Sequence, residues 1–498
     1  MVAAQVFTTA TKQKRPHIVY ILADDLGWND VGFHGSNAIQ TPNIDALAYS
    51  GIILQNFYVN PLCTPSRAAL MTGKYPIRTG MQHFVLYGAE PRGLPLKEKL
   101  LPEYLKELGY TNHMVGKWHL GHYKKKYTPL YRGFHSHLGF WTGRQDFYDH
   151  TACENGTWGL DMRRGMDVAY DLHGEYSTDV FTRKATSLIR DHDPSKPLFL
   201  YMSHAAMHSG NTYILISYAF LVALYKLDQS VGLLVEALSE RKMLEDTIII
   251  FTTDNGGPAA GFNINAASNW PLKGVKSTLW EGGVRGAALV WSTAFKNPGR
   301  VSTQLMDITY WLPTLLSAAS NKSIDTSDKP FSNTTILHNI DPIDGNAALR
   351  HGKWKYVNGT VFRGIGDASF GPSERSSEND YNVSLVLESV TGRVLKKLNR
   401  STSPEQIRKL RRQAMVVCSD RKDSKSCDPF HGPCLFNIED DPCETNNVAK
   451  EHPEVLKDLQ SRLNEISKTA EPPGNLPLYE RGNPEHWSYV WTNFGIIS

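Results

Sequence analysis

Three short apolar runs along the chain have the pattern of strands that are buried on both faces. They span His17–Ala23, Leu198–Met202 and Thr247–Thr252. None alternates apolar with polar positions as a half-exposed strand does, so each fits an inner strand of a parallel sheet. Between them, Leu100–Leu108 and Ser177–Arg190 place apolar residues on one side of a helix. Alternating strands and helices predict an α/β fold with a large, mainly parallel sheet flanked by helices.

The pattern changes after about residue 345, where polar loops and short apolar stretches replace the long runs. Short strands are predicted at Trp354–Val357 and Ser384–Leu387, a basic helix after Pro404, and an amphipathic helix over His452–Ile466. The basic helix (EQIRKLRRQ) fits a solvated surface, and contact with a sulfated polymer is the alternative. We therefore expect a disordered leader over residues 1–15, a large catalytic domain over 16–345 and a smaller C-terminal α+β domain over 346–498.

Composition narrows the class of protein. The chain has 498 residues, of which 41% are hydrophobic and 21% charged, with a formal net charge of +3. A chain of this length can bury a large core, and its balanced charge argues against a disordered chain or a nucleic-acid binder. The apolar run Tyr213–Leu227 is too brief and interrupted to span a membrane. We therefore expect a globular protein with no nucleic-acid partner and no membrane span.

The six cysteines give information on the cellular compartment in which the protein folds. Four of them, at 418, 427, 434 and 443, lie close together, whereas Cys63 and Cys153 stand apart. The cluster favours local disulfides in an oxidising compartment; the alternative is a zinc site, which usually contains a C-x-x-C pair that is missing here. N-x-S/T sequons add weak support for secretion. The first residues contain no apolar signal segment, so either an N-terminal piece is missing or the protein stays inside the cell.

Acidic residues follow two of the predicted strands. Asp24-Asp25 comes directly after the first strand, and Asp254-Asn255 comes after the third. In open α/β sheets, ligands bind beyond the carboxyl ends of the strands, where both pairs lie. Three carboxylates and one amide form a set of hard oxygen ligands that suits Ca²⁺ or Mg²⁺ and not zinc. The alternative for such a pair is a polar turn or a helix cap.

The segment from Cys63 to Gly73 (CTPSRAALMTG) places a cysteine at the expected start of a helix. Pro65 and the residues after it predict a helix that begins just after Cys63. A nucleophile there lies at the positive end of the helix dipole, which favours an anionic substrate. Arg67 lies one turn further along and can hold a bound anion. The alternative is a buried structural cysteine before a helix.

Three more segments contain candidate basic residues. GKWHLG contains Lys117 and His119, and SHAAMHS contains His204 and His208. The third, KGVKSTLWEGGVR, contains Lys273 and Lys276. A lone lysine or histidine is most often a surface or core residue, so each of these segments is weak by itself.

Together and in this order, the five elements resemble the sulfatase family. The cysteine segment matches the signature C-x-P-S-R-x-x-x-L-T-G, with Met71 where leucine is usual. The resemblance is greatest to the arylsulfatase B branch, through KWHLG, NWPLKGVKSTLWEGGVRG and CLFNIEDDPCETNN. That branch includes N-acetylgalactosamine-4-sulfatases, which act on dermatan and chondroitin sulfate in lysosomes. It implies an alkaline-phosphatase-like sulfatase fold and sulfated glycans or small molecules as substrates.

The resemblance also implies roles for individual residues. In the family, the formylglycine-generating enzyme of the ER oxidises the cysteine to formylglycine, and a hydroxyl of the hydrated aldehyde attacks sulfur. Lys117 would neutralise a sulfate oxygen, and His119 would hydrogen-bond the nucleophilic hydroxyl. His208, preferred over His204, would protonate the leaving oxygen. The remaining implied groups are Arg67 and Lys276 in the catalytic set, and one Ca²⁺ held by Asp24, Asp25, Asp254, Asn255 and position 63.

Two departures from the family leave alternatives open. The segment after His208 is shorter than usual and lacks a Pro-Leu-Gln piece, which suggests a deletion beside the active site. Cys153 lacks its usual partner and is expected to be a free thiol. The alternative functions are a catalytically inactive sulfatase-like protein and a phosphoester hydrolase of the same superfamily. Because formylglycine forms in the ER, an active protein is expected to be lysosomal or secreted.

Overall fold

The computed structural model describes residues 15–37, 39–210, 216–259, 261, 265–320, 334–371, 381–418 and 425–495. The predicted disordered leader therefore lies outside the described residues, apart from Arg15. In the part of the chain that is described, no helix is both long and apolar enough to cross a membrane.

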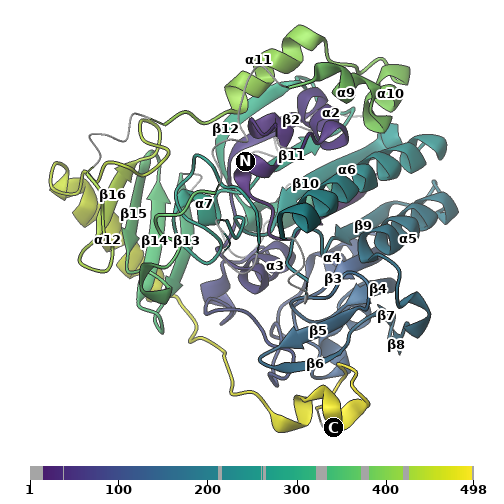
Figure 1. The fold of residues 1–498 in the computed structure, drawn as a ribbon, viewed down its shortest axis with the longest axis horizontal. Helices are drawn as coiled ribbons and strands as arrows, with labels where there is room; N and C mark the ends of the chain where they lie inside the picture. The colour runs from purple at the N-terminus through teal and green to yellow at the C-terminus, as the bar shows by residue number, and fades with distance from the viewer. Residues whose placement is uncertain are drawn as a thin grey trace.

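A ten-stranded sheet forms the centre of the molecule (Figure 1). Its strand order is β12-β2-β11-β10-β1-β9-β3-β4-β7-β8. The strands are β1 (His17–Ala23), β2 (Ile52–Tyr58), β3 (Thr111–Lys117), β4 (Ser136–Phe140), β7 (Arg163–Arg164), β8 (Asp167–Val168), β9 (Leu198–Ser203), β10 (Thr247–Thr253), β11 (Ala288–Trp291) and β12 (Arg300–Asp307). Strands β10, β1, β9, β3 and β4 pair in parallel. The prediction of a mainly parallel sheet is thus confirmed, with β11 and β7 antiparallel to their neighbours.

Strand β1 shows why the apolar runs lack alternation. Val19 and Ile21 pack into the core on one face of the sheet, whereas Tyr20 and Leu22 pack into the core on the other. One core is covered by α2 (Pro42–Ser50), α5 (Ser177–Asp191) and α6 (Ile216–Glu240), and the other by α3 (Cys63–Thr72), α4 (Leu101–Glu107) and α8 (Trp311–Ser320). The helices predicted over 100–108 and 177–190 are therefore confirmed. The run 213–227 lies partly outside the described residues, and its remainder forms the first half of α6.

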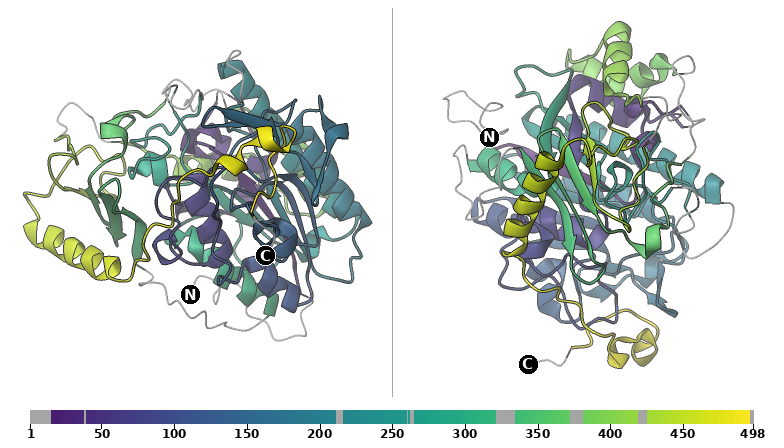
Figure 2. Two further views of the ribbon diagram at one scale, coloured as in Figure 1. Left: turned by 90° about the horizontal axis from the view of Figure 1, so that it is seen from below. Right: turned by 90° about the vertical axis from the view of Figure 1, so that its left-hand side faces the viewer.

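A second, antiparallel sheet lies beside the first (Figures 1 and 2). It contains β13 (Thr335–Asp341), β14 (Asn346–His351), β15 (Trp354–Asn358) and β16 (Cys434–Asn437). Helix α12 (Pro453–Ser467) packs on it through Leu459 and Ile466. A boundary after residue 345 falls between β13 and β14, which pair with each other, and the division into domains stays a prediction.

The strand predicted at Ser384–Leu387 is wrong, because this segment is helix α9 (Val383–Glu388). The Asn382 side chain accepts a hydrogen bond from Ser384 N as an N-cap, and Val383 and Val386 are buried at helical spacing. Helices α9, α10 (Val390–Lys397) and α11 (Pro404–Ala414) pack on the large sheet's core and not on the small sheet.

The basic helix α11 is only in part a solvated surface. Ile407 and Leu410 join the large core, and the buried Arg411 donates hydrogen bonds to the carbonyls of Gly32 and Gly35. The other basic side chains of α11 are exposed.

After α12 the chain returns from the small sheet to the part of the molecule built on the large sheet (Figure 2). Glu471 N donates to Ile77 O at 2.7 Å, and Gly474 N donates to Gly80 O at 2.8 Å. The buried Trp491 donates from Nε1 to a carbonyl of the hairpin β5 (Thr151–Glu154) and β6 (Thr157–Leu160). This C-terminal segment ties the small sheet to the loops that follow α3.

The four clustered cysteines form two disulfides, Cys418–Cys443 and Cys427–Cys434, which confirms disulfides in place of a zinc site. Cys63 and Cys153 are free.

Removal of one disulfide is expected to lower the free energy of unfolding more than removal of the other. The bridges close sequence separations of 25 and 7 residues. In the chain-entropy view, a longer closed loop restricts the unfolded chain more. Replacing Cys418 and Cys443 by serine should lower the free energy of unfolding by about 1 kcal/mol more than replacing the other pair. Urea unfolding of the two double variants measures the difference, and equal losses would contradict the expectation.

Candidate active site

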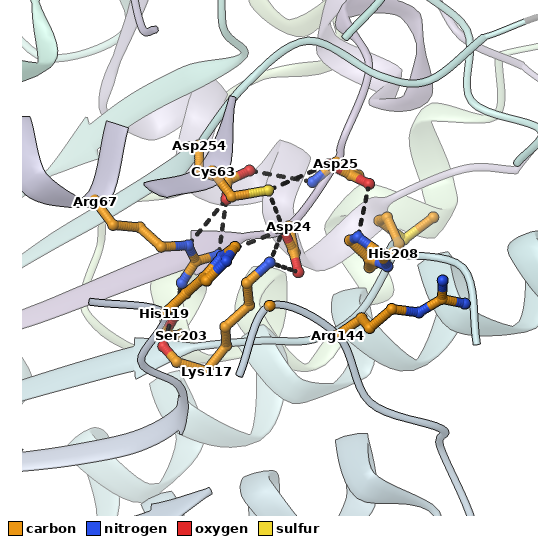
Figure 3. Close-up of polar contacts among 12 residues, drawn as sticks. Asp24, Asp25, Cys63, Arg67, Lys117, His119, Arg144, Ser203, His208 and Asp254 are labelled. Atoms are coloured by element: carbon orange, nitrogen blue, oxygen red, sulfur yellow. Dashed lines mark hydrogen bonds and ion pairs between the residues drawn. The ribbon is translucent and has the colours of Figure 1, made fainter. Parts of the chain in front are cut away.

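The acidic residues meet at the carboxyl edge of the large sheet, as expected. Strands β1 and β10 are parallel neighbours that pair up to Ala23 and Thr253, so the residues after them lie side by side. The carboxylates of Asp24, Asp25 and Asp254 and the Cys63 Sγ each offer an atom within 4.8 Å of the others (Figure 3). These side chains are all buried. Such a cluster can bind a metal ion.

Local backbone geometry helps to build this cluster. Asp25 has a φ of 62°, a left-handed conformation that is uncommon for a residue other than glycine. Its backbone N–H donates to Asp254 Oδ1 at 3.2 Å. The bend turns the second carboxylate of the pair back towards the end of β10.

Asn255 completes a set of oxygen ligands. Its Nδ2 donates to Asp25 Oδ1 at 2.8 Å, while its Oδ1 is buried without a hydrogen-bond partner among the described residues. Buried polar atoms normally have a partner, so this oxygen is suited to a bound cation. Three carboxylates and an amide oxygen fit a hard divalent metal. The structure thus brings together all five residues that the sequence nominated as metal ligands: Asp24, Asp25, Cys63, Asp254 and Asn255.

Cys63 is the first residue of α3, so the helix begins at the cysteine itself. Its Sγ lies 3.6 Å from Asp24 Oδ1 and 4.0 Å from Asp25 Oδ1. Burial raises the pKa of the Cys63 thiol to about 12. The side chain is therefore a thiol and not a thiolate at neutral pH in this arrangement.

Two lysines bind the carboxylates of the cluster. Lys117, the last residue of β3, places Nζ 3.0 and 2.8 Å from the two oxygens of Asp24. Lys276 places Nζ 2.6 and 2.8 Å from the two oxygens of Asp25. Burial raises the pKa of Asp24 to about 7, which Lys117 only partly offsets. Burial is the largest single influence on Asp25 and acts to raise its pKa, but Lys276, His208 and Lys117 together outweigh it and hold the pKa of that carboxyl well below its usual range.

Arg67 lies one turn along α3 and contacts residues at the ends of three strands, β1, β9 and β10. Its Nη2 lies 2.8 Å from Asp254 Oδ2 and 3.4 Å from Asp24 Oδ1. Its Nη1 donates to Ser203 Oγ at 2.6 Å. Ser203 ends β9, one residue beyond the strand expected from the sequence, which is why this partner was missed. The guanidinium thus holds Asp254 in the cluster, and contact with a bound anion stays a prediction.

The segment that carries Lys276 is held by the small sheet. Glu281, five residues later in α7 (Glu281–Val284), accepts from Lys355 Nζ on β15 at 2.9 Å. Its backbone N–H donates to Glu444 Oε2 at 2.7 Å. All three side chains are buried. Lys273, the rival of Lys276, instead lies over the Trp280 ring at 3.5 Å.

His119 borders the cluster as a neutral ring. Its Nε2 hydrogen-bonds to Leu86 O at 3.0 Å, and its Nδ1 is buried without a partner among the described residues. Burial holds the pKa of His119 well below its usual value. With Nε2 donating to the carbonyl, Nδ1 is left as an acceptor. Leu86 was not nominated from the sequence, because a backbone contact leaves no signal in residue type.

The two histidines of the segment SHAAMHS, His204 and His208, have different surroundings. His208 Nε2 lies 3.6 Å from Asp25 Oδ2, and its Nδ1 hydrogen-bonds to Ser209 O at 3.0 Å. Burial lowers the pKa of His208 to about 3, although Asp25 acts in the opposite direction. His204 instead hydrogen-bonds to Ser230 Oγ at 3.1 Å. Only His208 thus contacts the acidic cluster.

The arrangement places a buried set of oxygen ligands, which could hold a cation, beside a concentration of positive charge, which could hold an anion. Carboxylates and the Asn255 oxygen form the first, while Lys117, Lys276 and the start of α3 supply positive charge for the second. Cys63 lies between the two. A group at this position can contact a metal and an anionic substrate at the same time.

Comparisons with known proteins converge on one family. The family model described as Sulfatase matches residues 16–321. The chain is 36% identical to mouse (Mus musculus) arylsulfatase J over 97% of this chain and 81% of that protein. It is 35% identical to human N-acetylgalactosamine-6-sulfatase over 62% of this chain and 64% of that protein. The crystal structure of Ps i-CgsB in complex with k-i-k-neocarrahexaose is 25% identical, with a TM-score of 0.69, over 93% of this chain and 95% of that chain.

Proposed function

We propose that this chain, which belongs to the sulfatase family and hydrolyses sulfate esters, acts through a formylglycine made from Cys63 and a bound Ca²⁺. The observation that carries the proposal is the position of Cys63 Sγ, 3.6 Å from Asp24 and 4.0 Å from Asp25 at the start of α3. Lys117 and Lys276 are bonded to the same two carboxylates.

Each step of the proposed reaction is assigned to particular residues of this chain. A maturation enzyme, using an external oxidant, would convert Cβ of Cys63 to an aldehyde with loss of the thiol sulfur. One hydroxyl of the aldehyde's hydrate would attack the sulfur of the ester and expel the alcohol. The second hydroxyl would then lose its proton and collapse to the aldehyde, which breaks the C–O bond to sulfate and releases it. Lys117 and Lys276 would stabilise the charge on the sulfate oxygens. The unpartnered Nδ1 of His119 can accept a hydrogen bond from the hydrate. Proton transfer to the leaving oxygen falls to His208.

The residues present fit Ca²⁺, which would lower the energy of an oxyanion at position 63 when it is bound. Asp24, Asp25, Asp254 and Asn255 would hold it, since each offers an oxygen and together they form an anionic hard-ligand set. Arg67 keeps Asp254 in place through its ion pair at 2.8 Å.

Sulfated sugars are the proposed substrates. The names of two similar proteins refer to sugars, one to N-acetylgalactosamine and one to a neocarrahexaose ligand. The sequence resemblance to arylsulfatase B adds glycosaminoglycan N-acetylgalactosamine-4-sulfate as the specific candidate. Maturation of Cys63 requires passage through the ER, so we place the active protein in lysosomes or outside the cell.

The test is sulfate release by the protein purified from animal cells that express it behind a signal peptide. Turnover of 4-methylumbelliferyl sulfate, together with an aldehyde mass at position 63, would support the proposal. Faster turnover of 4-methylumbelliferyl phosphate would favour the phosphoester hydrolase. Folded protein that turns over neither ester would overturn the proposal and favour an inactive sulfatase-like protein.

His208→Ala is expected to slow poor leaving groups more than good ones. A general acid matters most when the departing oxygen is strongly basic, as in a sugar alcohol, and least for an activated phenol. We expect kcat to fall about 100-fold or more for a sulfated sugar, and much less for a nitrophenyl sulfate. His204→Ala is the matched control, because His204 contacts Ser230 and not the cluster. Equal losses on both substrates would contradict the role of His208.

A further inference from the structure

We propose that Arg144 binds a second anionic group of the substrate, on the leaving-group side of the scissile bond. The inference rests on the proposed function, because it assigns part of the specificity of the same site. The ligand class is a sulfate ester whose alcohol also carries a carboxylate or another sulfate.

Arg144 spans the space between the two active-site histidines. The preceding Gly143 packs so closely on His119 that an added Cβ would lie 2.6 Å from His119 Nε2. At its other end, Arg144 donates from Nη2 to Gly210 O at 2.9 Å, two residues after His208. Figure 3 shows the guanidinium on the His208 side of the site and away from the Cys63 Sγ. The side chain therefore reaches the leaving group and not the reacting sulfate.

The guanidinium has no ionic partner in the described part of the chain. Its one side-chain hydrogen bond among the described residues is the bond to Gly210 O, and its Nε is buried without a hydrogen-bond partner there. Arg144 does influence one carboxylate, that of Glu154. Burial raises the pKa of Glu154, and the charge of Arg144 offsets part of that rise. Both oxygens of Glu154 are already used, by the backbone N–H groups of Gly143 and Gly88. A buried unpartnered Nε beside unused donors provides a ready position for an anion.

The active site is more exposed on the His208 side, where Arg144 lies, than around Asp24, Arg67 and Lys117. The side chains of Asp24, Arg67 and Lys117 are fully buried, whereas that of His208 is 10% exposed and Arg144 is only partly buried. The site therefore opens to solvent on the His208 side. The bulk of a substrate must lie there once its sulfate is among the lysines.

The chemistry of the side chain selects the class of group. A guanidinium presents paired N–H donors in a plane that match the two oxygens of a carboxylate or sulfate, and it keeps its charge at all relevant pH values. A neutral sugar hydroxyl would leave that charge uncompensated near the buried site. Polyanionic chains that carry a uronate or a second sulfate next to the hydrolysed ester would neutralise the charge of the guanidinium.

The experiment compares three aryl sulfates: phenyl sulfate, 4-carboxyphenyl sulfate and 1,4-phenylene disulfate. The proteins are wild type, Arg144→Gln, Arg144→Lys and the control Arg164→Gln, which removes an arginine that is exposed and paired with Asp171. We expect Arg144→Gln to lower kcat/KM for one or both doubly charged esters about tenfold or more, and for phenyl sulfate less than about twofold. Arg144→Lys should recover part of the loss, and Arg164→Gln should match wild type. The ester that responds identifies the carboxylate or the sulfate as the group bound.

Equal losses on all three esters would overturn the proposal, because they would indicate that Arg144 merely positions His119. Unchanged kinetics would overturn it as well. If instead the proposed function is wrong, the wild-type protein will not turn over phenyl sulfate. In that case, calorimetric binding of 4-sulfobenzoate against benzenesulfonate still decides the role of Arg144. The proposal then requires that Arg144→Gln weaken the first ligand and not the second.

Discussion

Cys63→Ala is expected to lower sulfate-ester turnover about ten-thousand-fold or more, because among the described residues it removes the one side chain that lies within the acidic cluster and is placed to act as nucleophile. The other hydroxyls near the start of α3 are committed elsewhere. Thr64 Oγ1 accepts from Leu86 N at 3.0 Å, and Ser66 Oγ accepts from Asn60 N at 2.9 Å. Neither can turn towards the acidic cluster without loss of these bonds.

The matched control for this variant is Cys153→Ala. Cys153 is the other free cysteine and lies half-buried on β5 outside the acidic cluster. We expect it to keep wild-type turnover, and both variants to keep the wild-type melting temperature within a few degrees. Mass spectrometry of the peptide that contains position 63 shows whether wild type carries the aldehyde. Retention of more than a tenth of the activity in Cys63→Ala would contradict a nucleophile at this position.

The large sheet was predictable because its inner strands are apolar on both faces. The runs at 17–23, 198–202 and 247–252 match β1, β9 and β10 to within a residue. The error at Ser384–Leu387 has a local cause. A run of four residues, SLVL, fits either a strand or one helical turn, and the Asn382 cap decides for the helix. Packing of α9 to α11 on the large sheet was likewise not encoded in any local pattern.

The acidic cluster was predictable from strand ends, because parallel neighbours bring their carboxyl ends together. The partners that hold it were not. Ser203 binds Arg67 from a third strand, and Glu281 reaches across to Lys355 on the small sheet. Such contacts depend on strand order and on how the two sheets face each other. Residues that can take part in catalysis are therefore easier to identify from the sequence than the residues that hold them in place.

Ca²⁺ is expected to stabilise the protein, and Asp254→Asn to abolish that stabilisation together with most of the turnover. A ligand that binds only the folded state adds about 4 kcal/mol at a thousand times its dissociation constant. For a protein of this size we expect the melting temperature to rise by at least about 3 °C on addition of Ca²⁺ to chelator-treated protein. The variant removes one of three carboxylates and also the Arg67 partner at 2.8 Å.

Asp307→Asn is the matched control. Asp307 is also a buried aspartate at the end of a strand of the large sheet, but it hydrogen-bonds to Thr309 outside the acidic cluster. The control should keep the Ca²⁺-dependent rise in melting temperature even if its starting stability changes. A full Ca²⁺ response in Asp254→Asn would exclude Asp254 as a ligand. No response in wild type would mean that Lys117 and Lys276, bonded to Asp24 and Asp25, already satisfy the cluster without a metal.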